Sequence, residues 1–140
     1  MAQMGESELA AFLAETRLAV LTTLRDDGSP VAVPVWFEWD GDVARMFSGW
    51  RAGKTHRLQR DARATLLVPN HVDELERWVA FDGEVAIRDH GGFELADRMA
   101  QRYWDMERPE RRAELESWRK MASHLRLLEL RPTVVRSWKG

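Results

Sequence analysis

The residues best suited to chemistry gather in one polar stretch, between an expected strand over Val43–Ser48 and an expected helix over Lys54–Arg60. Backbone N–H groups at a helix start point outward, and the helix dipole favours an anion there. A lysine at that position adds a full positive charge. The combination of hydroxyls, cations and small residues predicts a phosphate site. The loop that would form it holds Ser48, Gly49, Arg51, Gly53, Lys54 and Thr55.

The same stretch also fits an ordinary strand-to-helix connection. It matches neither the Walker A pattern nor GxGxxG, so no nucleotide-binding motif identifies it. Lys54 could be a solvated charge, although a cation at a helix start is mildly unfavourable. We interpret Arg57 and Arg60 as surface charges of the helix, with Asp61 as the candidate ion-pair partner.

Other site chemistries find little support in the sequence. Cysteine is absent, which excludes disulfides, thiol catalysis and thiolate metal sites. The four histidines lack metal-ligand spacing, so we interpret them as non-ligands. Ser48 is not part of a nucleophile elbow, which disfavours hydrolysis. A net charge of −2 gives no basic field for nucleic acid.

Length and composition predict one folded domain spanning residues 1–140, because 44% of the residues are hydrophobic. The first residues carry no secretory signal pattern, and no apolar run approaches the ~20 residues of a membrane span. We therefore expect a cytoplasmic protein without a membrane partner. Seven tryptophans are many for this length, and we expect several to line a groove or an interface.

Short strands linked by turns dominate the first two thirds of the chain. The expected strands are Arg17–Leu24, Pro30–Trp39, Val43–Ser48, Ala62–Val68, Arg77–Arg88, Leu125–Leu130 and Thr133–Trp138. The expected helices are Glu6–Glu15, Lys54–Arg60, Phe93–Met106 and one beginning at Pro109, with Ser7 capping the first. Strands and helices do not alternate regularly, which predicts a mainly β, α+β fold built on an antiparallel barrel.

Glycine and proline positions refine this expectation. Asp27-Gly28 and Asp40-Gly41 predict hairpin turns, and Gly83 within a long strand predicts a bulge. Pro34 cannot donate a ladder hydrogen bond, so an edge or a gap of the sheet is expected there. A flat ligand could approach the backbone at such a place.

Several ordered segments together carry a family resemblance. They are Leu21–Leu24 before Asp27–Pro30, then Val33–Phe37, Ser48, Lys54–Asp61 with Ala62–Ala64, and the closing Arg131–Trp138. In this order they resemble the pyridoxamine 5′-phosphate oxidase-like family of FMN-binding split β-barrels. The flavin/deazaflavin oxidoreductase branch is the most similar. His56, Arg57 and Gln59 depart from the usual pattern of the family's basic helix.

The resemblance implies a homodimer with a flavin-type cofactor in a groove between the subunits. The ring would lie against the backbone of Val33, Pro34, Val35 and Trp36. The phosphate would contact Ser48, Lys54 and Thr55, with Trp50 and Arg51 beside it. We interpret Trp36 as a packing residue more than a stacking one. Trp78 and Trp138 fall in regions that lie near the partner subunit in the family.

These observations lead to an oxidoreductase that binds coenzyme F420 or FMN and exchanges hydride with a small-molecule substrate. The cofactor would carry the reaction, so no catalytic side chain is assigned. Pyridoxamine phosphate oxidase activity itself is disfavoured, because the substrate-binding arginine and histidine pattern of that enzyme is not matched. Two alternatives remain: a non-catalytic flavin, haem or tetrapyrrole carrier of the same fold, and a structural dimer with a degenerate site.

Overall fold

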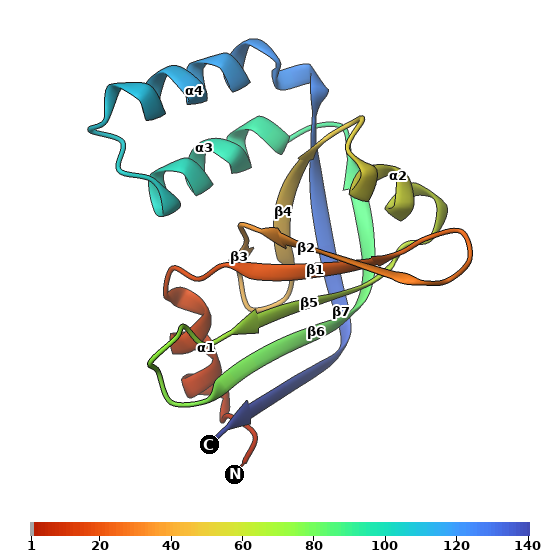
Figure 1. Ribbon diagram of the computed structural model, residues 1–140, viewed down its shortest axis with the longest axis vertical. Helices are drawn as coiled ribbons and strands as arrows, with labels where there is room; N and C mark the ends of the chain where they lie inside the picture. Colours follow the sequence, from red (N-terminus) through yellow and green to blue (C-terminus); the bar gives the residue numbers. More distant parts are fainter. Residues whose placement is uncertain (1) are drawn as a thin grey trace.

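The computed structural model describes residues 2–140 (Figure 1). Its helices and strands follow the chain in this order: α1 (Glu6–Ala14), β1 (Ala19–Leu24), β2 (Pro30–Val35), β3 (Glu38–Trp39), β4 (Ala44–Gly49), α2 (Gly53–Arg60), β5 (Arg63–Pro69), β6 (Arg77–Arg88), α3 (Gly92–Tyr103), α4 (Pro109–Lys120), the short 3₁₀ helix η1 (Ala122–His124) and β7 (Leu125–Lys139).

The strands form one seven-stranded antiparallel sheet in the order β2-β1-β5-β6-β7-β4-β3. The sheet curls into a half-barrel, so that β2 and β4 approach each other across its open side (Figure 1). The α+β class and the split-barrel form expected from the sequence are therefore confirmed. Strand β2 pairs only with β1, which confirms the edge expected at Pro34.

Helices cover both faces of the curled sheet. The inner face holds the main core, where Phe12 and Leu13 of α1 and Leu58 of α2 join strand residues such as Phe81 and Leu128. Helix α3 lies against the outside of β4 and β7, and α4 returns antiparallel beside it (Figure 1). This α3–α4 hairpin extends over the edge of the sheet near the end of β2.

Turn chemistry locates the hairpins as expected. Gly28 and Gly41 have φ values of 84° and 99°, a region that only glycine adopts freely. Asp40 Oδ1 accepts hydrogen bonds from the backbone N–H groups of Asp42 and Val43, both at 2.8 Å, and so closes the β3–β4 turn. The bulge expected at Gly83 is also present, as a register shift between Asp82 and Gly83 opposite β7.

Two strand boundaries differ from expectation. The strand expected over Pro30–Trp39 is interrupted at Trp36 and Phe37, because these residues leave the β1 ladder and turn toward α3. The two expected final strands form one continuous strand, β7. Arg131-Pro132 does not end it, because the bulge opposite Gly83 absorbs the proline. A Cβ at Gly83 would lie 2.3 Å from the Arg131 carbonyl oxygen, so the two strands need glycine there.

Helix ends show smaller differences. Gly5, not Ser7, occupies the N-cap of α1, and no side chain caps that helix. Helix α3 ends at Tyr103, three residues before the expected end, because Trp104 adopts an extended conformation. Pro109 begins α4, as expected. Among residues 2–140, the helices are all too short or too polar to span a bilayer.

Candidate functional site

A groove of about 400 Å³ opens where the end of β2 meets α2 and the α3–α4 hairpin. Its lining is apolar and aromatic apart from one charged side chain, the Lys54 ammonium group. The lining residues are Leu18, Pro34, Val35, Trp36, Phe47, Lys54, Trp104 and Trp118. This volume lies within the range of small-molecule sites, which are mostly apolar with a few placed polar groups.

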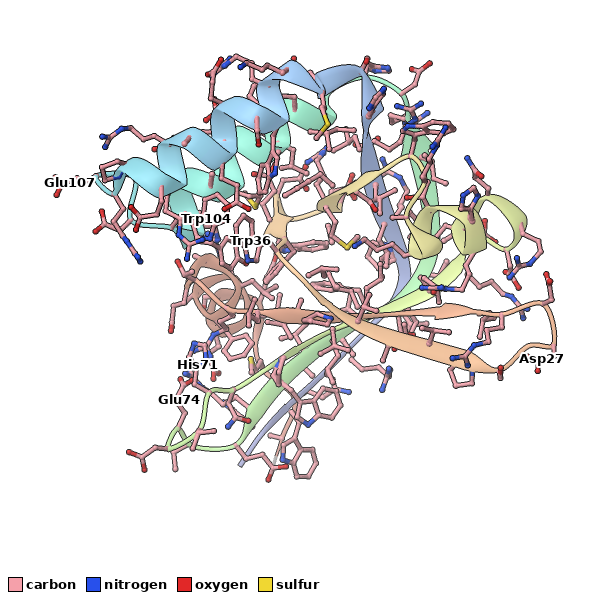
Figure 2. All side chains as sticks on the ribbon, turned by 45° about the horizontal axis from the view of Figure 1, so that its top comes forward. Asp27, Trp36, His71, Glu74, Trp104 and Glu107 are labelled. Atoms are coloured by element: carbon pink, nitrogen blue, oxygen red, sulfur yellow. The ribbon has the colours of Figure 1, made fainter. Side chains whose placement is uncertain are left out.

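Three of the seven tryptophans form the aromatic wall of this groove. The Trp36 and Trp104 rings meet edge to face with centroids 5.0 Å apart, and Trp118 lies 5.1 Å from Trp104. Figure 2 shows Trp36 and Trp104 side by side beneath the α3–α4 hairpin. Arg111 covers the Trp104 ring, with its guanidinium carbon 4.6 Å from the ring centroid. Such a wall presents flat, polarisable surfaces to a conjugated ring.

Tyr103 holds Trp36 in place from behind. The two rings are parallel to within 4°, with centroids 4.9 Å apart. The Tyr103 hydroxyl donates to the Arg17 carbonyl oxygen at 2.6 Å and accepts from the Phe37 N–H at 3.3 Å. This hydroxyl therefore partners backbone groups exposed where β1 and β2 stop pairing. Trp36 is both a packing residue, as expected, and a wall of the groove.

Lys54 and Arg57 are adjacent cations on α2. Lys54 is half-buried, and it forms no ion pair or side-chain hydrogen bond with residues 2–140. Burial, and secondarily the charge of Arg57, lower the pKa of Lys54 from its usual value. A desolvated cation repelled by a second cation is an unfavourable arrangement unless an anion binds there. The arrangement is thus chemically suited to a phosphate group.

Ser48 and Thr55 lie together beneath this loop. Both are buried, and the Thr55 hydroxyl lies 3.1 Å from Ser48 Oγ and 2.8 Å from the Gly49 carbonyl oxygen. Their hydroxyls thus satisfy each other and the backbone, which ties the end of β4 to α2. In this arrangement they position the loop around Lys54.

The remaining expected site residues occupy different places. Pro34, Val35 and Trp36 line the groove with Lys54, whereas Val33 packs against the main core. Trp50 and Arg51 lie on the exposed loop outside the groove, where the Arg51 guanidinium covers the Trp50 ring at 4.5 Å.

The interpretation of the basic helix is corrected in part. Arg60 is a surface charge, but its partner is Asp26, at 2.5 Å, while Asp61 pairs with Arg63. Arg57 is not a surface charge paired with Asp61. Its Nε donates to Thr23 Oγ1 at 2.7 Å, and it lies half-buried over β1.

Four groove residues, Leu18, Phe47, Trp104 and Trp118, were not expected from the sequence. Leu18 and Phe47 resemble ordinary strand residues, and nothing in the sequence marks them. Trp104 directly follows α3 and Trp118 lies in α4, both far along the chain, and only the high tryptophan count pointed to them. Their position depends on the α3–α4 hairpin folding back over the end of β2.

Comparisons with known proteins agree with this architecture. The family model of pyridoxamine 5′-phosphate oxidase matches residues 6–139. An F420H(2)-dependent biliverdin reductase from Mycobacterium tuberculosis is 38% identical over 97 residues, covering 66% of this chain and 68% of that protein.

Two solved structures share the fold. One is described as an F420 reductase; it has a TM-score of 0.73 and 21% identity, and the match covers 89% of this chain and 93% of that one. The other is a FAD and haem binding protein from Mycobacterium smegmatis, with a TM-score of 0.72 and 22% identity over 97% of this chain and 71% of that one. From the family match over nearly its whole length, this chain belongs to the pyridoxamine 5′-phosphate oxidase family of split β-barrels.

Proposed function

We propose that this protein is an oxidoreductase that binds a flavin-type cofactor, with coenzyme F420 as the first candidate and FMN as the second. The groove carries the proposal, because it joins an aromatic wall to the Lys54 ammonium group, which has no ion-pair partner among the described residues 2–140. The similarity to an F420H(2)-dependent biliverdin reductase favours F420 and a reductase reaction. A structural dimer with a degenerate site would have no need of such a groove.

The residues present fit such a cofactor. A planar ring can lie between the β2 edge and the indole rings of Trp36 and Trp104, where contact with water is reduced. An edge strand offers backbone N–H and C=O groups to the polar rim of the ring. Lys54 would lie at the phosphate end, and Ser48 and Thr55 fix the loop that carries it. Trp50 and Arg51 would reach only the outer part of the phosphate tail.

The cofactor, when bound, supplies the hydride chemistry. The protein orients the ring and leaves one side of the groove for a small organic acceptor. Trp104 and Trp118 line that side, so they contact the acceptor in this proposal. No side chain needs to exchange a proton in the hydride step itself.

A homodimer is part of the proposal. The outer face of β1, β5, β6 and β7 has a depression of about 370 Å³ lined mainly by apolar residues, among them Trp78 and Ala80. Trp138 pairs with Trp78 across the strands, and Val134 is 50% exposed on the same face. An apolar face of this kind favours association. Light scattering at micromolar concentration should show two chains per particle, and a pure monomer would contradict the dimer.

A turnover assay tests the function itself. Purified protein is mixed with reduced F420 and a panel of conjugated acceptors beginning with biliverdin, and oxidation of F420 is followed by absorbance. Oxidation that depends on both protein and acceptor supports an oxidoreductase. Tight cofactor binding without turnover of any acceptor, by F420 or by FMN with a reductant, would instead support the carrier function.

A further inference from the structure

Arg57 is fixed in position by two features of its surroundings. Its Nε donates to the hydroxyl of Thr23, which is fully buried on β1, at 2.7 Å. A Cβ at residue 53 would lie 2.9 Å from Arg57 Nη1, so Gly53 leaves the space that the guanidinium occupies. The side chain therefore folds back along α2, and its terminal nitrogens lie beside Gly53, next to Lys54.

Arg57 differs from the neighbouring arginines in its charge pairing. Arg60 and Arg63 form ion pairs with Asp26 and Asp61, whereas Arg57 has no carboxylate partner among residues 2–140. Its terminal nitrogens also have no hydrogen-bond acceptor in that part of the chain. Two adjacent cations without a counter-ion repel each other, and an anion bound between them would remove that cost.

We propose that Arg57 is a second anion-binding residue, beside the groove, which contacts the cofactor's phosphate group together with Lys54. The inference rests on the proposed cofactor function and adds to it a ligand that the sequence pattern did not indicate. Thr23 and Gly53 act as positioning residues, because they set the direction of the guanidinium before the ligand arrives. A pre-set guanidinium loses little side-chain entropy on binding.

Arg57→Gln tests the proposal, because glutamine removes the charge but retains a donor that can reach Thr23. Fluorescence titrations compare a phosphate-bearing cofactor with the same ring lacking the phosphate: FMN against riboflavin, or F420 against its phosphate-free deazaflavin. The phosphate-bearing form should bind about ten-fold more weakly to the variant. The phosphate-free form should bind as it does to the parent. Arg60→Gln is the matched control and should leave both affinities unchanged.

A salt series adds a second readout. The affinity of the parent for the phosphate-bearing form should fall as salt rises, and it should fall less steeply for Arg57→Gln. If Arg57→Gln does not fold, Thr23→Val replaces it. This variant keeps the charge of Arg57 but removes the hydroxyl that holds the guanidinium in place. A smaller preference for the phosphate-bearing form is expected for that variant too.

The outcomes separate the two proposals. If the parent binds cofactor but the variant keeps its full preference for the phosphate-bearing form, Arg57 only clamps α2 to β1, and this inference is overturned. If the parent binds neither F420 nor FMN, the proposed function falls, and the assignment of Arg57 falls with it. A loss for Lys54→Ala without a loss for Arg57→Gln overturns only the role of Arg57.

Discussion

Replacing Lys54 by alanine should weaken cofactor binding and leave the fold intact. A charge-assisted hydrogen bond from an ammonium to a phosphate is worth ~1.5–3 kcal/mol, or a roughly ten- to hundred-fold change in affinity. Lys54 is half-buried, repelled by Arg57 and without an ion-pair partner among residues 2–140. The unliganded protein should therefore lose little when the charge is removed.

Thermal melting with and without cofactor measures both effects in one assay. The melting temperature of the unliganded Lys54→Ala variant should lie within about 3 °C of that of the parent. The increase in melting temperature on adding cofactor should shrink, because a weaker ligand stabilises the native state less. Arg60→Ala is the control, since Arg60 pairs with Asp26 and donates to the Leu24 carbonyl oxygen.

Three results would refute this reasoning. Equal cofactor-induced shifts for the parent, Lys54→Ala and Arg60→Ala would show that the phosphate does not bind at this loop. A loss for Arg60→Ala alone would show that the anion binds the opposite face of α2. A large drop in the melting temperature of unliganded Lys54→Ala would contradict the view that this charge is unfavourable in the free protein.

Three further predictions concern the strand break, the dimer and acid stability. Tyr103→Phe keeps the stack on Trp36 but leaves backbone groups unpaired, so urea unfolding should show a loss of about 1–3 kcal/mol; an unchanged midpoint would contradict this. Val134→Glu places a charge on the apolar outer face and should convert the proposed dimer to a monomer in light scattering, whereas an intact dimer in the variant would place the interface elsewhere. The Arg45 guanidinium, followed by backbone N–H groups, lowers the pKa of Asp40 from 3.8 to about 2. The stabilising effect of the ionised Asp40 should be complete above pH 3.8 and fade toward pH 2. Asp40→Asn should therefore be less stable than the parent at pH 6 and nearly equal to it at pH 2. An equal difference in stability at both pH values would count against this role.

Local patterns predicted the hairpins and the general fold well. Gly28 and Gly41 lie in turns that need positive φ, and the glycine itself reveals this requirement in the sequence. The break at Trp36 and Phe37 could not be predicted in the same way, because the alternating pattern continues through it. A distant hydroxyl, that of Tyr103, supplies the hydrogen bonds that end the ladder there. Tertiary contacts therefore decided where β2 stops.

In the candidate site, too, local sequence indicated some residues, and tertiary contacts decided the place of the others. Pro34 was predicted to border a ligand because proline cannot donate a ladder hydrogen bond, and Lys54 because it begins a helix after a polar loop; the structure brings both into one groove. Trp104 and Trp118 were missed, since their place depends on how the α3–α4 hairpin packs against β4 and β7. Arg57 was misinterpreted because its partner, Thr23, lies 34 positions earlier in the sequence, beyond the reach of helix-spacing arguments.

Direct titration of the purified parent protein with F420 and with FMN tests the central claim most directly. Quenching of tryptophan fluorescence reports occupancy, because Trp36, Trp104 and Trp118 line the groove. Saturable binding of at least one of the two cofactors, one molecule per chain and weakened by salt, is the predicted result. Absence of saturable binding for both cofactors would contradict the account.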